Sequence, residues 1–227
     1  GKDPVGEGEL AEVPDVDGDI PLPVGCATNI YPDFIVRNNE DNKTTVIIDY
    51  IGTERNVIIP SSIECYTVVG IDPYAFNTLS DSLATNTIEV DLKSVELPNT
   101  LTFIGKYAFR SNSLKEVKFD GSLETIGAGA FMNNMIKEIV FSTHSKLESI
   151  GIFAFFNNKI TDLSIPEGIK TLGSGTFANN LINGLDLPKT LLTITGRETD
   201  IGAFEDNHIK EFVIPADVTL IGANAFN

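Results

Sequence analysis

Cysteine and histidine are scarce in this sequence, which has two of each, and their scarcity excludes several kinds of site. Cys26 and Cys65 lack the spacing of zinc ligands, and two histidines cannot build a histidine-rich metal site. We therefore predict no metal site. We predict no cofactor either, because each I-G-x-x-A-F segment is a coil turn and not the phosphate-binding loop G-x-G-x-x-G. The two cysteines leave two alternatives open: a disulfide bond near the N-terminus, or two separate thiols.

Basic residues and long apolar runs are also lacking. The chain has 16 Lys and Arg against 32 Asp and Glu, a formal net charge of −16. Such a surface repels phosphate backbones and anionic lipids, so nucleic acid and membrane surfaces are poor partners. No apolar run approaches the ~20 residues of a membrane helix, so we expect no membrane insertion by this segment.

What the sequence does contain is a repeat with a base period of 22 residues. An Ile-Gly or Leu-Gly pair and then a small residue precede a recurring phenylalanine, as in "IGKYAF" from Ile104. The phenylalanines are 33, 22, 24, 22, 27 and 22 residues apart: Phe76, Phe109, Phe131, Phe155, Phe177, Phe204 and Phe226. This period indicates a solenoid of stacked coils. We predict that the phenylalanines form a core spine and not a surface that stacks a cofactor.

The other half of each repeat predicts a short strand. It reads "LKEVKFD" from Leu114 and "ITDLSIP" from Ile160, where apolar and polar residues alternate as in a half-buried strand. The proline that often follows ends the strand, because it has no N–H to donate.

An asparagine lies two residues before this strand segment in five consecutive repeats. Its amide is both donor and acceptor, so it can satisfy the backbone groups of a buried turn. We predict a structural ladder, with ligand binding as the alternative, formed by Asn112, Asn134, Asn158, Asn180 and Asn207.

These motifs, N-x-[IL]-[KTN]-x-[VILF]-x-[ILF]-P and I-G-x-x-A-F, resemble the BspA-like leucine-rich repeats of bacterial surface and secreted proteins over about residues 54–227. The resemblance implies a β-rich α/β leucine-rich-repeat solenoid of about seven coils. It would have a parallel sheet on one face and short turns or 3-10 segments on the other. Two predicted strands, Phe34–Arg37 and Thr45–Tyr50, resemble the β-hairpin that opens such arrays, so residues 26–53 are expected to cap it.

Residues 1–25 differ from the rest, because they are acidic and rich in proline and glycine. We expect a disordered linker there. The stretch "DVDGDI" from Asp15 suggests a calcium loop, but it lacks the glycine and glutamate that an EF-hand has at its sixth and twelfth positions. A solvated acidic segment is the preferred interpretation.

Outward-pointing strand residues are the main candidates for a binding surface. Strands ~4.8 Å apart would align them into an acidic stripe that holds a cation or a Lys/Arg-rich partner. The alternative is a solvated face balanced by the nearby Lys93, Lys115, Lys137 and Lys210. The stripe has a first column of Glu116, Glu138, Asp162 and Glu211, and a second of Glu96, Lys118 and Asp186. Insertions at 77–91 and 195–200 are further candidates.

Catalysis has no support, since nothing places a nucleophile near His144 or His208. The resemblance implies a non-catalytic adhesion module that binds a protein or glycan partner outside the cell or at its surface, behind a signal peptide or lipid anchor. One alternative is a structural spacer that associates end to end, because the last coil, "IGANAFN", has no polar cap. Another is a carbohydrate-binding protein, suggested only by Tyr74 and Tyr107 in equivalent positions.

Overall fold

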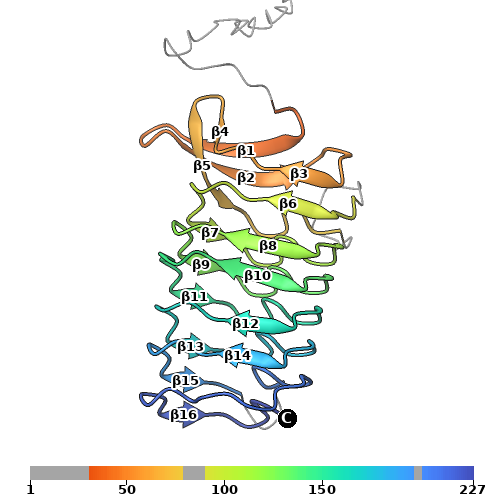
Figure 1. Cartoon of the computed structure of the whole chain (residues 1–227). Coiled ribbons are helices and arrows are strands. Elements are labelled where there is room, and N and C mark those ends of the chain that lie inside the picture. Colours follow the sequence, from red (N-terminus) through yellow and green to blue (C-terminus); the bar gives the residue numbers. More distant parts are fainter. Residues whose placement is uncertain (1–30, 79–89, 197–200) are drawn as a thin grey trace, which may run out of the picture.

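The computed structural model describes residues 31–78, 90–196 and 201–227, which form a stack of flattened coils (Figure 1). As predicted, the fold is a solenoid with parallel strands. The predicted 1–25 linker, the Asp15–Ile20 stretch and most of the two insertions lie outside the described residues.

The front face of the stack carries one short strand from each coil except the last described one, and these strands are parallel. Like-numbered positions of successive coils pair, as in Glu116 with Glu138 and Asp162 with Gly184. Gly184 also forms an isolated bridge to Glu211 in the next coil. The front strands are β3 (Asn56–Ile58), β6 (Ser94–Glu96), β8 (Glu116–Phe119), β10 (Glu138–Phe141), β12 (Asp162–Ser164) and β14 (Gly184–Asp186).

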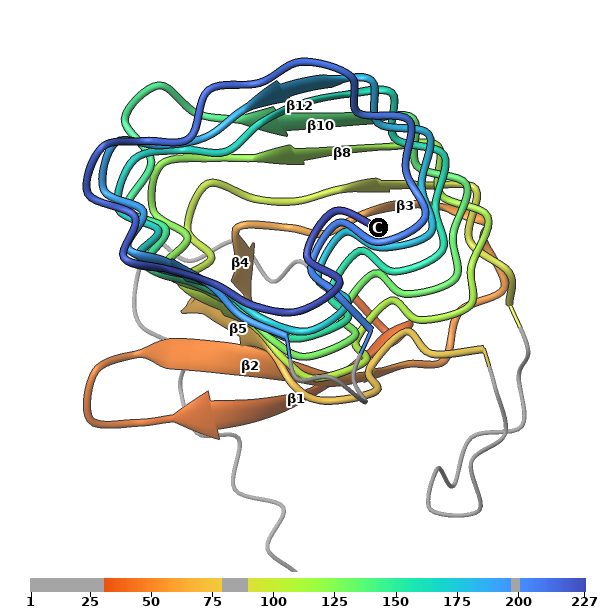
Figure 2. The same ribbon diagram turned by 90° about the horizontal axis from the view of Figure 1, so that it is seen from below.

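A second set of strands, which we call the flank sheet, runs along the opposite side of the coils (Figure 2). It consists of two ladders, because in the described residues no ladder joins β11 (Ser149–Ile150) to β13 (Thr171–Leu172). Its short strands contain the Ile or Leu of the Ile-Gly pairs, which we had not predicted to be extended. Its strands in the repeats are β5 (Tyr66–Ile71), β7 (Phe103–Ile104), β9 (Thr125–Ile126), β11 (Ser149–Ile150), β13 (Thr171–Leu172), β15 (Thr193–Ile194) and β16 (Leu220–Ile221).

Of the two alternatives expected for the side away from the front sheet, short turns or 3-10 segments, the described residues contain the turns and no helix. The turns are closed by bonds such as Ala108 N to Gly105 O (3.3 Å) and Arg110 N to Tyr107 O (3.2 Å). The reason that they are not helical is a left-handed residue in the middle of the turn, Tyr107 with φ 56°. A positive φ at this position interrupts any right-handed helical turn.

The N-terminal hairpin is continuous with the flank sheet. Strands β1 (Phe34–Asn39) and β2 (Thr44–Tyr50) are antiparallel, and β2 pairs in parallel with β5, so the hairpin covers the first coil. A second hairpin joins β4 (Ser62–Ile63) to β5 through Glu64 and Cys65, both at positive φ as in a type I′ turn. Cys65 is disulfide-bonded. Cys26 lies outside the described residues.

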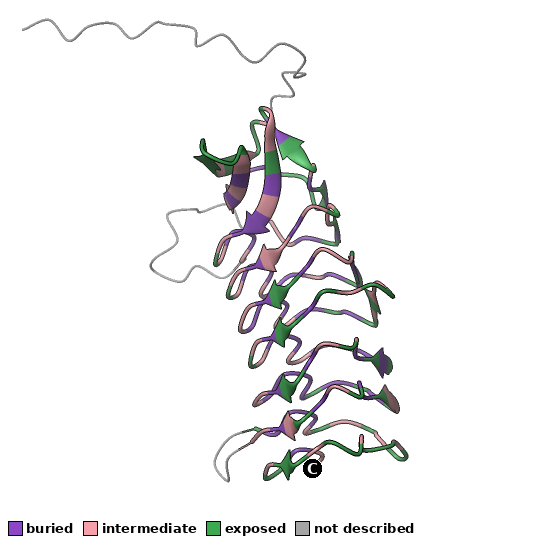
Figure 3. Ribbon diagram, turned by 90° about the vertical axis from the view of Figure 1, so that its left-hand side faces the viewer, coloured by how far each residue is buried: buried purple, intermediate pink, exposed green. Residues whose placement is uncertain are grey.

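The phenylalanines form the predicted spine. Successive rings from Phe76 to Phe226 have centroids 4.8–5.7 Å apart and planes inclined by 2–16°. Phe34 and Tyr50 of the hairpin extend this column above Phe76. Buried residues line the inside of each coil, and the last coil is more exposed than the middle ones (Figure 3).

Candidate functional site

The ladder asparagines use their amides to join neighbouring coils. Asn158 accepts a bond from Ile136 N (3.0 Å) and donates to the carbonyls of Phe131 (3.0 Å) and Phe155 (3.1 Å). Asn112, Asn134, Asn180 and Asn207 repeat this pattern. Because these bonds engage both the oxygen and the nitrogen of each amide, the geometry favours the structural interpretation of the column over ligand binding.

A second asparagine ladder lies beside the first and was missed by the sequence reasoning. Asn157 Nδ2 donates to Asn133 Oδ1 (2.9 Å), and Asn179 Nδ2 donates to Asn157 Oδ1 (3.0 Å). All three residues have φ of 55–58°, a left-handed conformation that asparagine tolerates better than most residues. The doubled asparagines in "MNN", "FNN" and "ANN" were the signal.

The proposed acidic stripe is present on the front face, and all of its members are exposed. Glu116 lies beside Glu138, and Asp186 beside Ser164. Lys118 contacts Glu116 at 3.7 Å. Within the part of the chain that the structure describes, Lys93, Lys115, Lys137 and Lys210 form no ion pair with the stripe. No group of three or more metal-ligating side chains occurs there either.

The stripe is interrupted because the front sheet is broken in two places. The front strands form three separate ladders, β3–β6, β8–β10 and β12–β14, with no ladder joining β6 to β8 or β10 to β12 in the described residues. The breaks follow the sequence of the coils. We call a coil a proline coil where Pro60, Pro98, Pro166 or Pro188 follows its strand, and a phenylalanine coil where its strand ends at Phe119 or Phe141.

Two neighbouring coils of the same kind pair through their front strands. Where a proline coil is next to a phenylalanine coil, no ladder joins the front strands of the two in the described residues. The strands of the phenylalanine coils are four residues long and those of the proline coils three. Phe119 and Phe141 stack at 5.4 Å, which joins the two phenylalanine coils to each other. A smaller cavity of about 360 Å³ opens at the β6–β8 junction, where Glu96, Glu116 and Lys118 are among its lining residues.

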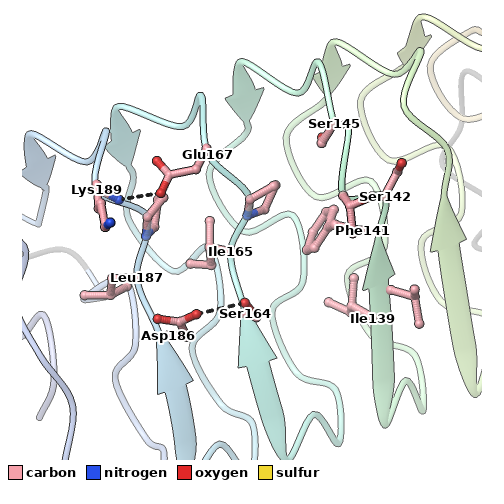
Figure 4. Close-up of a pocket in the computed structure, with 14 residues that line it drawn as sticks. Ile139, Phe141, Ser142, Ser145, Ser164, Ile165, Glu167, Asp186, Leu187 and Lys189 are labelled. Carbon is pink, nitrogen blue, oxygen red and sulfur yellow. Dashed lines mark hydrogen bonds between the residues drawn. The ribbon is translucent and has the colours of Figure 1, made fainter.

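The larger cavity, about 500 Å³, lies between β10 and β12, and we call it the junction groove (Figure 4). Its apolar lining includes Ile139, Phe141, Ile165 and Leu187. Ile139 and Phe141 are only half-buried, whereas their neighbours Val117 and Phe119 in β8 are at most 5% exposed. The break therefore gives solvent access to side chains that would otherwise belong to the core.

Polar groups form the rim of the junction groove. Ser164 Oγ donates to Asp186 Oδ2 at 3.2 Å, and Glu167 accepts a bond from the backbone N–H of Lys189 at 3.1 Å (Figure 4). Glu167 accepts a second bond from the backbone N–H of Thr190, also at 3.1 Å. These N–H groups, that of Lys189 foremost, hold the pKa of Glu167 below its ordinary value. Glu167 thus stays a carboxylate at neutral pH.

Tyr74 and Tyr107 do not form an open platform. Their ring centroids lie 5.5 Å apart, and Lys106 and Arg110 each lie 4.9 Å from the Tyr107 ring. A Cβ at Gly129, in the next coil, would lie 2.1 Å from the same ring. These contacts favour a packing role for the two tyrosines.

The repeat, the spine and the asparagine ladders are the features that a family comparison tests. The model of the BspA type leucine-rich repeat region matches residues 86–198 and 143–227, in six copies. The chain belongs to the BspA-type leucine-rich repeat family. No curated protein matches the sequence significantly.

Solved structures of other leucine-rich repeat proteins resemble this BspA-type chain. A leucine rich cell surface protein from Faecalibacterium prausnitzii is 27% identical, with a TM-score of 0.64 over 86% of this chain and 50% of that one. A leucine-rich repeat protein from Eubacterium ventriosum shares 22% identity, with a TM-score of 0.62 over 84% and 47%. The T. pallidum leucine rich repeat protein is 20% identical, with a TM-score of 0.51 over 86% of this chain and 86% of that one.

The chain therefore spans about half the length of the first two structures. Within its described residues, no helix has the length and hydrophobicity to cross a membrane.

Proposed function

We propose that this chain is a non-catalytic binding module, located outside the bacterial cell or on its surface, whose front face recognises a protein partner. Family membership and the resemblance to a leucine rich cell surface protein support the location and the general role. The observation that carries the proposal is the row of exposed acidic side chains on parallel strands, most of which form no ion pair with another residue that the structure describes.

The electrostatics favour a basic partner surface. Carboxylates projecting from a rigid sheet need no ordering before they bind, and a net charge of −16 steers basic partners toward the molecule. Because rim charges act mainly on the association rate, binding should weaken as ionic strength rises.

The test compares two charge reversals of equal size on an array of purified secreted and cell-surface proteins. Glu96→Lys/Glu116→Lys changes the front face. Glu124→Lys/Glu148→Lys changes exposed residues at the start of flank strands and is the matched control. We expect the front-face variant to bind the array partners of the wild type with at least tenfold lower affinity. The control variant should bind them with the affinity of the wild type. Equal binding by both variants would refute recognition through the front face.

A structural role through association between copies of this chain is the alternative proposal. It is supported by apolar side chains exposed at outward-facing positions of the front face, including Ile58 at 67% and Val213 at 81%. Light scattering coupled to size exclusion, over a hundredfold range of concentration, separates the two. A mass that rises with concentration would favour association, and a constant monomer mass would remove it.

A further inference from the structure

We propose that the junction groove between β10 and β12 binds an extended peptide segment in which an apolar side chain is flanked by lysine or arginine. This inference rests on the proposed protein-binding function and deepens it, because it names the form of the partner and the place where it docks. Three features of the groove support it: open strand edges, an accessible apolar lining and an acidic rim.

The strand edges that face each other across the groove are not joined in a ladder. β10 pairs with β8 and β12 pairs with β14, each on the side away from the groove. The bond from Lys159 N to Ile136 O (2.8 Å) still ties the two coils together just before these strands. The groove is therefore closed where the strands begin and opens toward their ends. An open edge of this kind can pair with the backbone of an added extended segment.

The lining supplies an anchor for an apolar side chain. Ile139 and Phe141 lie on β10 and are half-buried, although they belong to columns that are fully buried in β8. Ile165 and Leu187 contribute to the lining from the other side. A cavity of about 500 Å³ lies within the range of pockets that hold ligands, and burying this apolar surface favours binding.

The rim selects the charge of the occupant. Asp186 and Glu167 line the groove, and Glu138 and Asp162 are exposed on the two strands that flank it, whereas Lys189 is the one cation among the lining residues. Each carboxylate keeps acceptor capacity beyond its present bonds. A segment with lysine or arginine on either side of its apolar residue complements this rim, and an acidic segment is repelled.

The experiment uses a defined probe, the capped peptide Lys-Val-Lys-Trp-Lys-Val-Lys. The protein has no tryptophan, so the fluorescence and anisotropy of the probe report binding directly. Ser164→Tyr places a bulky ring at an exposed position that lines the groove, and Thr125→Tyr makes the same change at an exposed position on β9 of the flank sheet. We expect saturable binding to the wild type and to Thr125→Tyr, and at least tenfold weaker binding to Ser164→Tyr.

Two altered peptides test the chemistry of the site. Replacing every lysine by glutamate should abolish binding, and methylating alternate backbone nitrogens should weaken it at least tenfold. Equal affinity for Ser164→Tyr and Thr125→Tyr, or no saturable binding to the wild type, would overturn the proposal. A failure of the proposed function can be distinguished from a failure of this inference. The charge reversal at Glu96 and Glu116 lies outside the junction groove, and its effect is measured on the array partners and not on the peptide.

Discussion

Each ladder asparagine acts between two coils. Asn158 bonds the Phe131 carbonyl and the Ile136 N–H of the preceding coil, and the Phe155 carbonyl of its own. Without this amide, buried backbone groups at the turn would lack partners, and no water reaches a side chain that is 1% exposed to replace it. One residue type therefore satisfies the turns of the whole stack.

Replacing Asn158 with alanine tests this role. Because the change leaves buried backbone donors and acceptors without partners, we expect the free energy of unfolding to fall by about 1–3 kcal/mol. Urea denaturation measures the loss. Asn179→Gly is the control, since it keeps a left-handed residue and removes a bond of an exposed amide, and it should cost less than about 1 kcal/mol. Equal losses would contradict the structural role of the inner ladder.

Glu167 makes a pH-dependent contribution to the stability of the coil that contains β14. Its pKa is lowered from 4.5 by bonds from the Lys189 and Thr190 N–H groups. A carboxyl with a lowered pKa in the folded state stabilises the fold above its unfolded pKa, and this stabilisation is lost as pH falls through the folded pKa. The stability difference between wild type and Glu167→Gln should thus be present at pH 7 and should shrink below pH about 4.5.

Urea titrations at pH 7 and at pH 3 measure this difference. Glu148→Gln, at an exposed position in another coil, controls for the general effect of removing a charge. A difference for Glu167→Gln that is the same at both pH values would show that its carboxylate does not contribute through these bonds.

At the scale of the element, coils that pair are alike in the two positions that end their strands. The second position is proline in the proline coils and Asp120 or Ser142 in the phenylalanine coils, and a proline there has no N–H and ends the ladder early. Phe119 and Phe141 instead extend their strands by one residue and stack on each other. Neighbouring coils of different kinds have strands of different length and shape, and they leave the openings at β6–β8 and β10–β12.

Converting the β10 coil to a proline coil should close the junction groove. In the β10 coil, the flank-strand residue Ile150 lies nine residues after Phe141. In the next coil, the equivalent Leu172 lies only seven residues after the equivalent Ile165. Ser142→Pro with deletion of Thr143 and His144 removes this difference. We expect a new β10–β12 ladder, seen as at least tenfold slower hydrogen exchange at the amides of these strands, and loss of binding to the peptide probe.

The control for this variant keeps the length of the turn and changes only His144, as His144→Ser, because His144 is not among the residues that line the groove. It should leave both the exchange rates and the groove as they are. Unchanged exchange in the shortened variant would mean that the kind of coil does not determine the pairing.

At the scale of the whole molecule, the stacked rings form one continuous column from the hairpin to the last coil. In a solenoid each coil contacts only its neighbours, so cooperativity depends on every interface along the stack. A defect in the middle should uncouple the two halves, whereas a defect at an end should not.

Phe155→Ala creates such a defect, since Phe155 is fully buried between Phe131 and Phe177. We expect a loss of about 3–5 kcal/mol and an unfolding curve that separates into two transitions. Phe226→Ala, in the half-buried last ring, should cost less and leave a single transition. Circular dichroism during urea denaturation measures both. A single transition for Phe155→Ala would indicate that coupling does not pass through the spine.

The sequence by itself determined the features that recur within each coil. The spacing of Phe109, Phe131 and Phe155 predicted the spine, and the alternation in "LKEVKFD" predicted a half-buried strand, because both patterns follow from which side chains must leave water. The solenoid and the family resemblance followed from the same motifs, and the hairpin strands followed from the two apolar segments before them, Phe34–Arg37 and Thr45–Tyr50.

Only the tertiary structure decided how the coils meet. The flank sheet was missed because a strand of two residues has no alternation to detect. The second ladder was missed although the Asn-Asn pair recurs, because the spacing alone does not show that the first asparagine of each pair bonds the one in the next coil. The junction groove was missed because no single repeat contains it. It arises where two coils of different shape are stacked, and the fit between two surfaces depends on both of them together.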